Sequence, residues 1–185
     1  MSVLISIVSL PSFTVKAGST PGILGGTGSG KSTLLSIVGG FLPPDSGSVS
    51  WDGEDVYAMT DTRMAWMRCH RVGFVFQNFK LINTLSVRDN ILLPASMSDL
   101  AEKTVRENLK KYCDALDIAA LLDKYPDELS GGQQQRAAIC RALCFEPSLL
   151  ILDEPTAVLT PQETDELFAV IRRIVKEMGM TVLLI

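Results

Sequence analysis

A glycine-rich segment with a single lysine constrains the fold of this sequence more than any other feature. Residues 25–32 read GGTGSGKS and match the pattern G-x-x-x-x-G-K-[ST]. A short apolar stretch, Gly22–Leu24, precedes the segment, and a helical pattern follows it from Lys31 to Phe41. A strand, a glycine loop and a helix in this order predict an α/β fold in which the loop binds phosphate.

Each residue type in this loop has a physical reason. Glycines let the backbone wrap around a phosphate with its N–H groups pointing inward, and the helix adds partial positive charge at its N-terminus. The expected cradle consists of Gly25, Gly26, Thr27, Gly28, Ser29 and Gly30. We expect Lys31 to contact the β- and γ-phosphates, Ser32 to offer its hydroxyl to Mg²⁺, and Thr33 to reach the α-phosphate. Alone, the motif predicts only a bound nucleoside triphosphate, because kinases, GTPases and motor proteins share it.

An apolar stretch followed by two carboxylates marks a second candidate site. Leu149–Leu152 is a continuous apolar run, as expected of a parallel strand covered on both faces, and Asp153 and Glu154 follow it directly. At the end of the strand, Asp153 is placed to hold Mg²⁺ through its water shell. Because Glu154 is the next residue, it points elsewhere and can reach the water that attacks the γ-phosphate. We therefore predict that Glu154 is the general base or positions this water.

A third motif lies between these two. Leu129–Gln133 read LSGGQ, and Ser130 is a good N-cap for a helix that we expect to continue to Leu143. The next two residues, Gly131 and Gly132, leave backbone N–H groups free at the start of this helix. The chain therefore contains a second anion-binding helix terminus, for which a single copy has no obvious use.

The rest of the pattern predicts a helical arm inserted into the α/β core. Further strands are expected at Ser48–Trp51, Val72–Gln77 and Thr181–Ile185, and at the apolar start, Met1–Leu10. Helical patterns cover Ser86 to about Leu122, and Pro161–Glu177. We expect one domain, residues 1–185, with a mostly parallel sheet, an N-terminal antiparallel β portion with a tight turn at Asp52-Gly53, and a helical subdomain over about 84–144.

Composition and charge exclude several classes of protein. The net charge of −4 disfavours a binder with a broad basic face, so no nucleic-acid partner is expected. No run approaches the ~18 apolar residues of a membrane span, although a mean hydropathy of +0.24 leaves apolar surface for a partner. The cysteines form no CxxC pair, which indicates a reducing compartment, and Cys140 and Cys144 are expected to be free buried thiols. The single histidine, His70, is expected at a surface or in a turn.

Together these motifs resemble the nucleotide-binding subunit of ATP-binding-cassette (ABC) proteins. They come in that family's order: the phosphate loop at Gly25–Ser32, a glutamine at Gln77, the signature LSGGQ at Leu129–Gln133, and the acidic strand end at Asp153-Glu154. The resemblance covers nearly the whole chain. It implies the P-loop NTPase fold, with ATP and Mg²⁺ as ligands.

The resemblance also implies two protein partners. In this family two cassettes face each other head to tail, so each ATP lies between the phosphate loop of one copy and the signature of the other, here Ser130, Gly131, Gly132 and Gln133. The first partner is then a second nucleotide-binding subunit. Gln77 is expected to join Mg²⁺ and the attacking water to the helical arm, and Asn78–Leu85 to shape a groove for a transmembrane permease. The chain is accordingly expected at the cytoplasmic side of the membrane.

Three positions depart from the family's pattern. The family carries a histidine just beyond the strand that ends here at Ile185, and the given sequence stops before it, which suggests a truncated reading frame. An aromatic residue upstream of the loop normally stacks on adenine; only Phe13 is available, and we expect it to pack in a strand instead. Thr160 stands near the end of the loop after Glu154, where the family has an aspartate that couples the two sites.

Two functional hypotheses follow. The leading one is an ATP-hydrolysing subunit that powers a membrane transporter; the alternative is a regulatory or structural module that binds ATP and dimerises but hydrolyses little. The stretch SGGQQQR and the segments that start at Gly40 and Val72 look most like the lipoprotein-releasing and macrolide-efflux subclass, and the related cell-division ATPase is equally compatible. A soluble relative acting on DNA or ribosomes is disfavoured, because only one cassette is present and the spacing leaves no room for a coiled-coil insertion.

Overall fold

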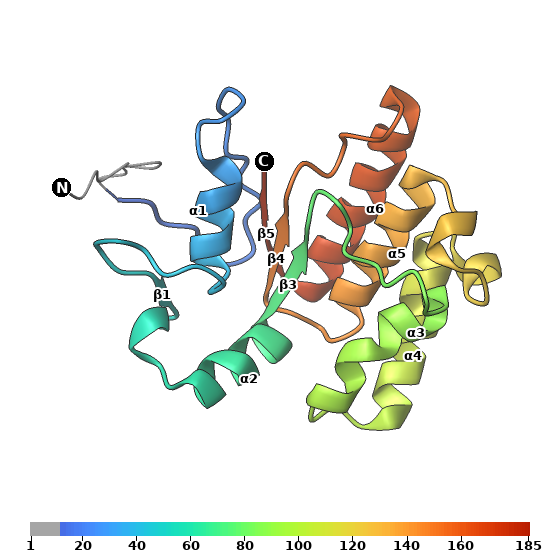
Figure 1. Ribbon diagram of the computed structural model, residues 1–185, viewed down its shortest axis with the longest axis horizontal. Helices are drawn as coiled ribbons and strands as arrows, with labels where there is room; N and C mark the ends of the chain where they lie inside the picture. Colours follow the sequence, from blue (N-terminus) through green and yellow to red (C-terminus); the bar gives the residue numbers. More distant parts are fainter. Residues whose placement is uncertain (1–11) are drawn as a thin grey trace.

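A parallel sheet of three strands lies at the centre of the molecule (Figure 1). The computed structural model describes residues 12–185, without the side chains of residues 96 and 97. The strand order is β3-β4-β5, with Val72 paired to Leu149 and Leu149 to Thr181. The bounds are Val72–Val75 (β3), Leu149–Leu152 (β4) and Thr181–Leu184 (β5). Gly22 forms a parallel bridge with Leu184, so the chain that leads into the phosphate loop runs beside β5.

Alternate residues of the strands face two separate hydrophobic clusters. Leu150 and Leu152 of β4 lie in a large cluster with residues of α5 and α6, whereas Ile151 lies in a small cluster with Leu35 of α1. The helices are α1 (Lys31–Val38), α5 (Gly131–Leu143) and α6 (Pro161–Met178). Figure 1 shows α1 on one side of the sheet and α5 and α6 on the other. Helices thus cover both faces, and the predicted α/β fold with a parallel sheet is confirmed.

The helices between β3 and α5 form a group that lies beside α5 (Figure 1). They are α3 (Val87–Leu92), the 3-10 helix η2 (Leu93–Met97), α4 (Glu102–Ala115), and the 3-10 helices η3 (Ala119–Leu121) and η4 (Pro126–Glu128). The helical pattern expected from Ser86 to Leu122 is therefore broken. Pro94 lies at the start of η2, and Asp117 after α4 has a φ of 54°, which a right-handed helix does not accommodate.

A short antiparallel hairpin follows α1. Strand β1 (Ser50–Trp51) pairs with β2 (Glu54–Asp55). The turn residues Asp52 and Gly53 have φ values of 51° and 85°, and a two-residue hairpin turn favours positive φ at both positions. The expected antiparallel portion and its tight turn are confirmed, with the strand beginning at Ser50 rather than Ser48.

The sequence pattern did not predict helix α2 (Asp61–Arg71), which follows the 3-10 turn η1 (Val56–Ala58). Its composition is mostly polar and only Met67 is buried, so apolar periodicity is weak. The missed signal lies at its start, where the Thr60 hydroxyl accepts a hydrogen bond from the Arg63 N–H. His70 belongs to this helix, where it is half-buried and stacks on Trp66 with ring centres 4.4 Å apart, so of the two expected locations, a surface or a turn, the turn was wrong.

The N-terminal residues and the cysteines differ in how well the sequence predicted them. The strand expected at Met1–Leu10 lies outside the described residues. Phe13 lies in no strand and is 44% exposed, so the expectation that it packs in one was wrong. Cys140 and Cys144 are buried and free, as expected. In the part of the chain that is described, no helix combines the length and apolarity needed to cross a membrane.

Asn90 ties the loop before α3 to that helix. Its buried side-chain amide donates to the carbonyls of Ile82, Leu85 and Ser86, and its side-chain oxygen accepts from the Ile82 N–H. We expect Asn90→Ala to lower the free energy of unfolding by about 2–4 kcal/mol, because these groups lose their partner. Chemical denaturation measures the loss. Asn83→Ala, at an exposed position of the same loop, should change it by less than about 0.5 kcal/mol; equal losses would contradict this role.

Candidate functional site

The phosphate loop lies at the carboxyl end of the parallel sheet, next to the point where β4 ends (Figure 1). Open α/β sheets bind ligands at this edge, because the loops after neighbouring strands converge there. Ser32, in the first turn of α1, donates a hydrogen bond from Oγ to Oδ1 of Asp153 at 2.9 Å. This bond joins two motifs that lie far apart in the sequence.

Glycines give the phosphate loop its shape. Gly28 and Gly30 have φ values of 77° and 86°, in the left-handed region that favours glycine. A Cβ at Gly25 would lie only 2.7 Å from Ser29 Oγ, so a side chain there would force Ser29 to change its rotamer. The N-cap of α1 is Gly30, which has no side chain that could accept a hydrogen bond from the first N–H groups of the helix. The backbone donors of the first turn are therefore available to an anion, as phosphate binding requires.

The side chains of the loop are arranged around these donors. Lys31 Nζ donates to the carbonyl oxygens of Gly25 at 2.9 Å and Gly26 at 3.0 Å, which holds the ammonium group across the loop. Among the described residues Lys31 forms no ion pair. Thr27 is exposed on the loop, and Thr33 is half-buried one residue beyond Ser32. The lysine charge therefore lies beside the backbone donors and is available to a phosphate.

Asp153 provides the acidic side of the site. It is 8% exposed, and this burial raises its pKa; the Ser32 hydrogen bond opposes the shift, Glu154 adds to it, and the Lys31 charge opposes it. The described residues contain no group of three or more His, Cys, Asp or Glu that could hold a metal ion. Mg²⁺ does not need one, since it is usually bound by one or two side chains together with substrate phosphates. The hydroxyl and carboxylate oxygens of Ser32 and Asp153 fit that requirement.

Gln77 and Glu154 form a direct hydrogen bond, from Nε2 to Oε2 at 2.8 Å. Gln77 comes two residues after β3 and Glu154 two residues after β4, so the pairing of these strands brings the two side chains together. The Asp153 N–H also donates to the Val75 carbonyl, which continues the ladder past β4. Glu154 has a φ of 48°, so the backbone turns immediately after Asp153 and the two carboxylates separate. The two acids thus have different partners, as the sequence predicted.

The signature Leu129–Gln133 forms the start of α5, with Ser130 as the N-cap. Ser130 Oγ accepts from the Gln133 N–H at 3.3 Å, and Gln133 Oε1 accepts from the Ser130 N–H at 3.0 Å. This capping box confirms the expected cap. A Cβ on Gly131 would lie 3.2 Å from Val158, and one on Gly132 would lie 3.0 Å from Leu159. Within residues 12–185, no hydrogen bond joins the signature to the phosphate loop.

Sequence reasoning missed two residues of α5 that contact this site. Gln135 is 1% exposed and donates from Nε2 to the carbonyl of Pro155, the residue after Glu154. Arg141 donates to the carbonyls of Phe79 and Lys80, shortly after Gln77. Both act on backbone carbonyls far away in the sequence, which a local motif cannot reveal. The only available signal was a polar side chain on a helix that is otherwise mostly buried.

Thr160, which departs from the family's pattern, is the N-cap of α6. Its Oγ1 accepts from the Glu163 N–H at 3.3 Å, and its own N–H donates to Glu163 Oε2 at 2.8 Å. The hydrogen bonds from Thr160 lower the pKa of Glu163. Threonine can serve as an N-cap, so this local role is filled at the position where the family has aspartate.

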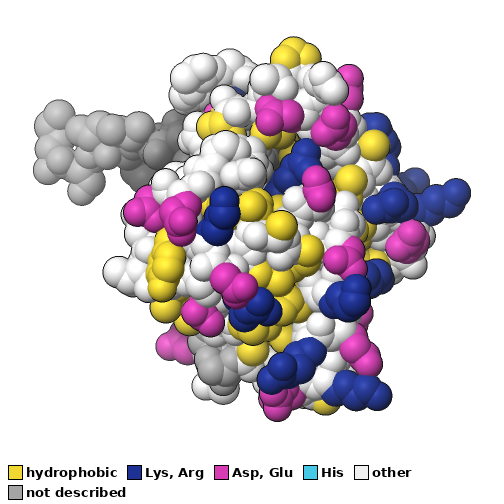
Figure 2. Space-filling view, turned by 90° about the vertical axis from the view of Figure 1, so that its right-hand side faces the viewer, with side chains coloured by type: hydrophobic (Ala, Val, Ile, Leu, Met, Phe, Trp, Pro, Cys, Tyr) yellow, Lys and Arg dark blue, Asp and Glu magenta, His cyan; other side chains and the backbone are white. Residues whose placement is uncertain are grey.

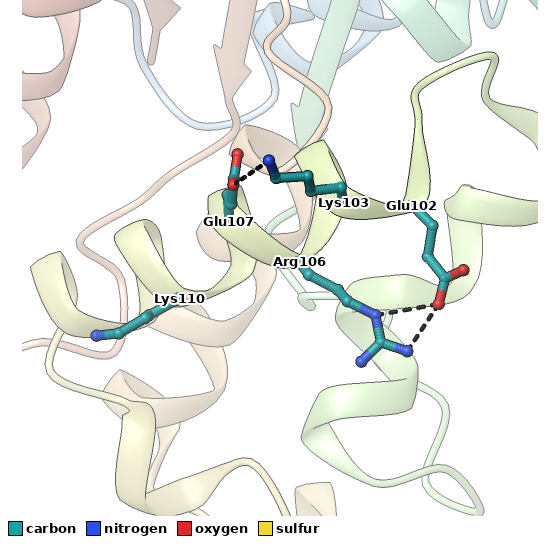
Figure 3. A pocket seen from close by; sticks show the side chains of 5 residues that line it. All are labelled: Glu102, Lys103, Arg106, Glu107 and Lys110. Carbon is teal, nitrogen blue, oxygen red and sulfur yellow. Dashed lines mark hydrogen bonds and ion pairs between the residues drawn. The ribbon is translucent and has the colours of Figure 1, made fainter.

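A surface hollow of about 450 Å³ lies on the outer face of α4, remote from these motifs in the sequence (Figure 3). Its lining residues are Glu102, Lys103, Arg106, Glu107 and Lys110. Arg106 pairs with Glu102 and Lys103 with Glu107, one helical turn apart, as on a solvated helix face. Figure 2 shows basic and acidic side chains interspersed over the face that it displays. We therefore place the functional site at the phosphate loop.

Known proteins resemble this chain over most of its length and not only at the motifs. The sequence model of the ABC transporter family matches residues 8–157. The methionine import ATP-binding protein MetN 4 of Oceanobacillus iheyensis is 41% identical over 174 residues, covering 94% of this chain and 50% of the relative. MetN of Rhizobium meliloti is 40% identical, covering 94% of this chain and 48% of the relative. The chain thus spans about half the length of the curated relatives it matches.

Solved structures share the fold. A dimeric post-hydrolysis state of the ATP-binding cassette MJ0796, bound to ADP and Pi, has a TM-score of 0.85 at 31% identity, covering 93% of this chain and 76% of that chain. CbiO1 from Clostridium perfringens, part of the ABC transporter complex cbiONQ, has a TM-score of 0.81 at 34% identity, covering 93% and 68%. Motif order, site geometry and both comparisons agree, and we conclude that this chain belongs to the ABC transporter family.

Proposed function

We propose that the chain is the ATP-binding and ATP-hydrolysing cassette of a membrane transporter. The observation that carries the proposal is the convergence of two side-chain pairs beside the phosphate loop, Ser32 with Asp153 and Gln77 with Glu154. Phosphoryl transfer to water requires a loop that binds phosphate, two oxygen ligands for a cation, and a separate carboxylate that acts on the water. We also propose a single cassette domain with its helical subdomain at about 84–144.

The phosphate loop orients the triphosphate. Backbone N–H groups of Gly25–Gly30 and of the first turn of α1 bind the phosphates, Lys31 neutralises charge on the β- and γ-phosphates, and Thr33 binds the α-phosphate. Ser32, Asp153 and Gln77 would hold Mg²⁺. When bound, this ion neutralises charge on the β- and γ-phosphates. The contribution of these residues is mainly positioning and charge stabilisation.

Glu154 takes the proton from the attacking water. Its carboxylate lies outside the Ser32–Asp153 pair and accepts one hydrogen bond from Gln77 Nε2, which leaves further lone pairs for a water molecule. Gln77 orients the carboxylate without removing its charge. A positioned base of this kind contributes about 10²–10⁴-fold to the rate.

Two copies of the chain complete each site. The backbone donors after Ser130 form a second anion site that no hydrogen bond of the described residues joins to the chain's own phosphate loop. In a head-to-tail dimer, Ser130, Gly131, Gly132 and Gln133 of one copy bind the γ-phosphate held by the other. The cassette MJ0796, which shares this fold, has a dimeric structure, and this supports the formation of a dimer.

The composite site can be tested by complementation. Ser130→Asp keeps an N-cap oxygen but places a carboxylate beside the partner's γ-phosphate, so we expect the variant to fold and to hydrolyse ATP poorly. Lys31→Ala should be inactive for a different reason. Mixing the two variants creates one site with an intact loop and an intact signature, and phosphate release should be partly restored. If the mixture stays as inactive as its components, the dimeric site is rejected. Thr60→Asp replaces the N-cap of α2, away from the site, and controls for the introduction of a carboxylate at a helix cap.

The second partner is a transmembrane permease that docks on Asn78–Leu85, which places the cassette at the cytoplasmic side of the membrane. The cargo is read by the permease. Relatives named methionine import ATP-binding proteins favour an amino-acid importer, whereas the sequence motifs resemble the lipoprotein-releasing and macrolide-efflux subclass. Uptake of labelled methionine by vesicles that contain the assembled transporter distinguishes the two. ATP hydrolysis with and without the permease distinguishes a transport ATPase from a regulatory module.

A further inference from the structure

The chain forms a strained turn directly after Gln77. Phe79 and Lys80 have φ values of 58° and 49°, so two consecutive residues with side chains adopt the left-handed conformation. Each such residue is strained, because the left-handed conformation brings its Cβ close to the following carbonyl oxygen. Phe79 packs against the large hydrophobic cluster, while Lys80 is exposed. A turn of this kind persists only where its surroundings hold it in place.

Arg141, near the end of α5, provides the contacts that hold this turn. Its Nη2 donates to the Phe79 carbonyl at 2.7 Å and its Nη1 donates to the Lys80 carbonyl at 2.8 Å. Within residues 12–185 it forms no ion pair, so its charge is directed at these two carbonyls. Burial lowers the pKa of the guanidinium, in keeping with this lack of a carboxylate partner. Two charge-assisted bonds from one rigid fork fix both position and direction.

The same helix also holds the backbone on the Glu154 side. Gln135 of α5 donates from Nε2 to the carbonyl of Pro155, and its own Oε1 is buried without a partner. One helix therefore holds the segments that follow both members of the Gln77–Glu154 hydrogen bond. Because α5 begins at the signature, it also connects this pair to the surface that we assign to the second copy.

We propose that Arg141 is a positioning residue for ATP hydrolysis: it fixes the Phe79–Lys80 turn and thereby keeps Gln77 Nε2 on the Glu154 carboxylate. The expected effect on ATP hydrolysis rests on the proposed function, whereas the expected effect on the position of Gln77 does not. Arg141 has no hydrogen bond to the phosphate loop, and Ser32 and Asp153 would still hold Mg²⁺ when Gln77 is displaced, so the loss of Arg141 should affect turnover much more than nucleotide affinity. Arg136 is a matched control, because it lies on the same helix and donates to the carbonyl of Leu116, away from Gln77.

The first test is steady-state kinetics of the full chain. We expect Arg141→Met to lower kcat by about 10- to 100-fold, the scale of a misplaced catalytic group, with KM for ATP within about twofold. Arg141→Lys keeps the charge and can reach one carbonyl, so its kcat should be intermediate. Millimolar guanidinium should raise kcat of Arg141→Met and leave Arg136→Met unchanged. A rise in KM, or equal rescue of both variants, would overturn the proposal.

A second test uses the strain of the turn itself. Glycine adopts positive φ without a steric cost, so Lys80→Gly should restore part of the kcat lost in Arg141→Met. Lys80→Ala removes the same side chain but retains a Cβ, and should restore nothing. If alanine rescues as well as glycine, Arg141 does not act through the left-handed turn.

The third test does not need hydrolysis. In an NMR spectrum, the side-chain amide signal of Gln77 is assigned by its loss in Gln77→Ala. In Arg141→Met this signal should move toward that of a glutamine with no hydrogen-bond partner in the protein, because the bond to Glu154 is lost, and in Arg136→Met it should stay in place. If the chain does not bind or hydrolyse ATP, the proposed function is refuted. The position of the Gln77 amide signal still decides whether Arg141 positions Gln77. An unchanged Gln77 signal in a folded Arg141→Met protein refutes the positioning role.

Discussion

Replacing Glu154 by glutamine is expected to lower the rate of ATP hydrolysis by about 10²–10⁴-fold, the range of a lost general base, while ATP affinity stays within about twofold. The substitution is conservative in shape: the amide oxygen of glutamine can still accept the hydrogen bond that Gln77 Nε2 now gives to Glu154 Oε2. The Ser32–Asp153 hydrogen bond does not involve Glu154. The substitution removes the negative charge and with it the ability to take a proton, so the main loss should appear in kcat.

Phosphate release gives the rate, and calorimetric titration with Mg²⁺-ATP gives the affinity. Glu146→Gln is a matched control, because Glu146 is an exposed glutamate with a φ of 50° that precedes β4 instead of following it. Its turnover should equal that of the unmodified chain. Unchanged turnover in Glu154→Gln would exclude Glu154 as the base, and a parallel loss of affinity would assign it to binding instead.

Replacing Lys31 by alanine is expected to weaken Mg²⁺-ATP binding by about 100-fold or more. Two unit charges about 4 Å apart interact with about 4 kcal/mol at an effective dielectric of 20. Solvent screening at this open loop reduces the net contribution of the Lys31 charge to the binding free energy to about 3 kcal/mol, which corresponds to roughly 100-fold in Kd. The variant also loses the bonds from Nζ to the Gly25 and Gly26 carbonyls, so the loop is less well ordered for its ligand.

Calorimetry on the full chain tests this with two ligands. Affinity for Mg²⁺-ATP should fall, whereas binding of adenosine, which has no phosphate, should not change. Lys103→Ala removes a lysine from the outer face of α4 and serves as the control (Figure 3). Equal affinity of Lys31→Ala and the unmodified chain for ATP would reject the assigned role of the lysine.

The components of the site could be predicted from the sequence because each is a local pattern. The phosphate loop combines glycines, a lysine and a helix start within a few residues, and Asp153 and Glu154 directly follow an apolar strand. The cap at Ser130 could be predicted for the same reason, since its partner Gln133 is three residues away. These features depend on neighbouring residues and are little affected by tertiary packing.

The contacts between these components could not be predicted. The Gln77–Glu154 hydrogen bond depends on which strands pair and in what register, and a continuous apolar run such as Leu149–Leu152 carries no register information. Arg141 and Gln135 recognise backbone carbonyls, which are present at every residue. Helix α2 was missed because its polar composition gives no apolar period, although Thr60 marked its start.

The parallel sheet has a consequence for how the chain folds. Val72 pairs with Leu149, and Gly22 pairs with Leu184, so most of the chain must be synthesised before its central strands can associate. Such non-local pairing slows folding, because a large loop must close before any contact compensates for the lost chain entropy. During translation β3 therefore stays unpaired until β4 has been synthesised, and β4 stays unpaired on its other edge until β5 has been synthesised. We therefore expect the apolar segments Val72–Val75 and Leu149–Leu152 of the nascent chain to need a chaperone until the ribosome has released β5.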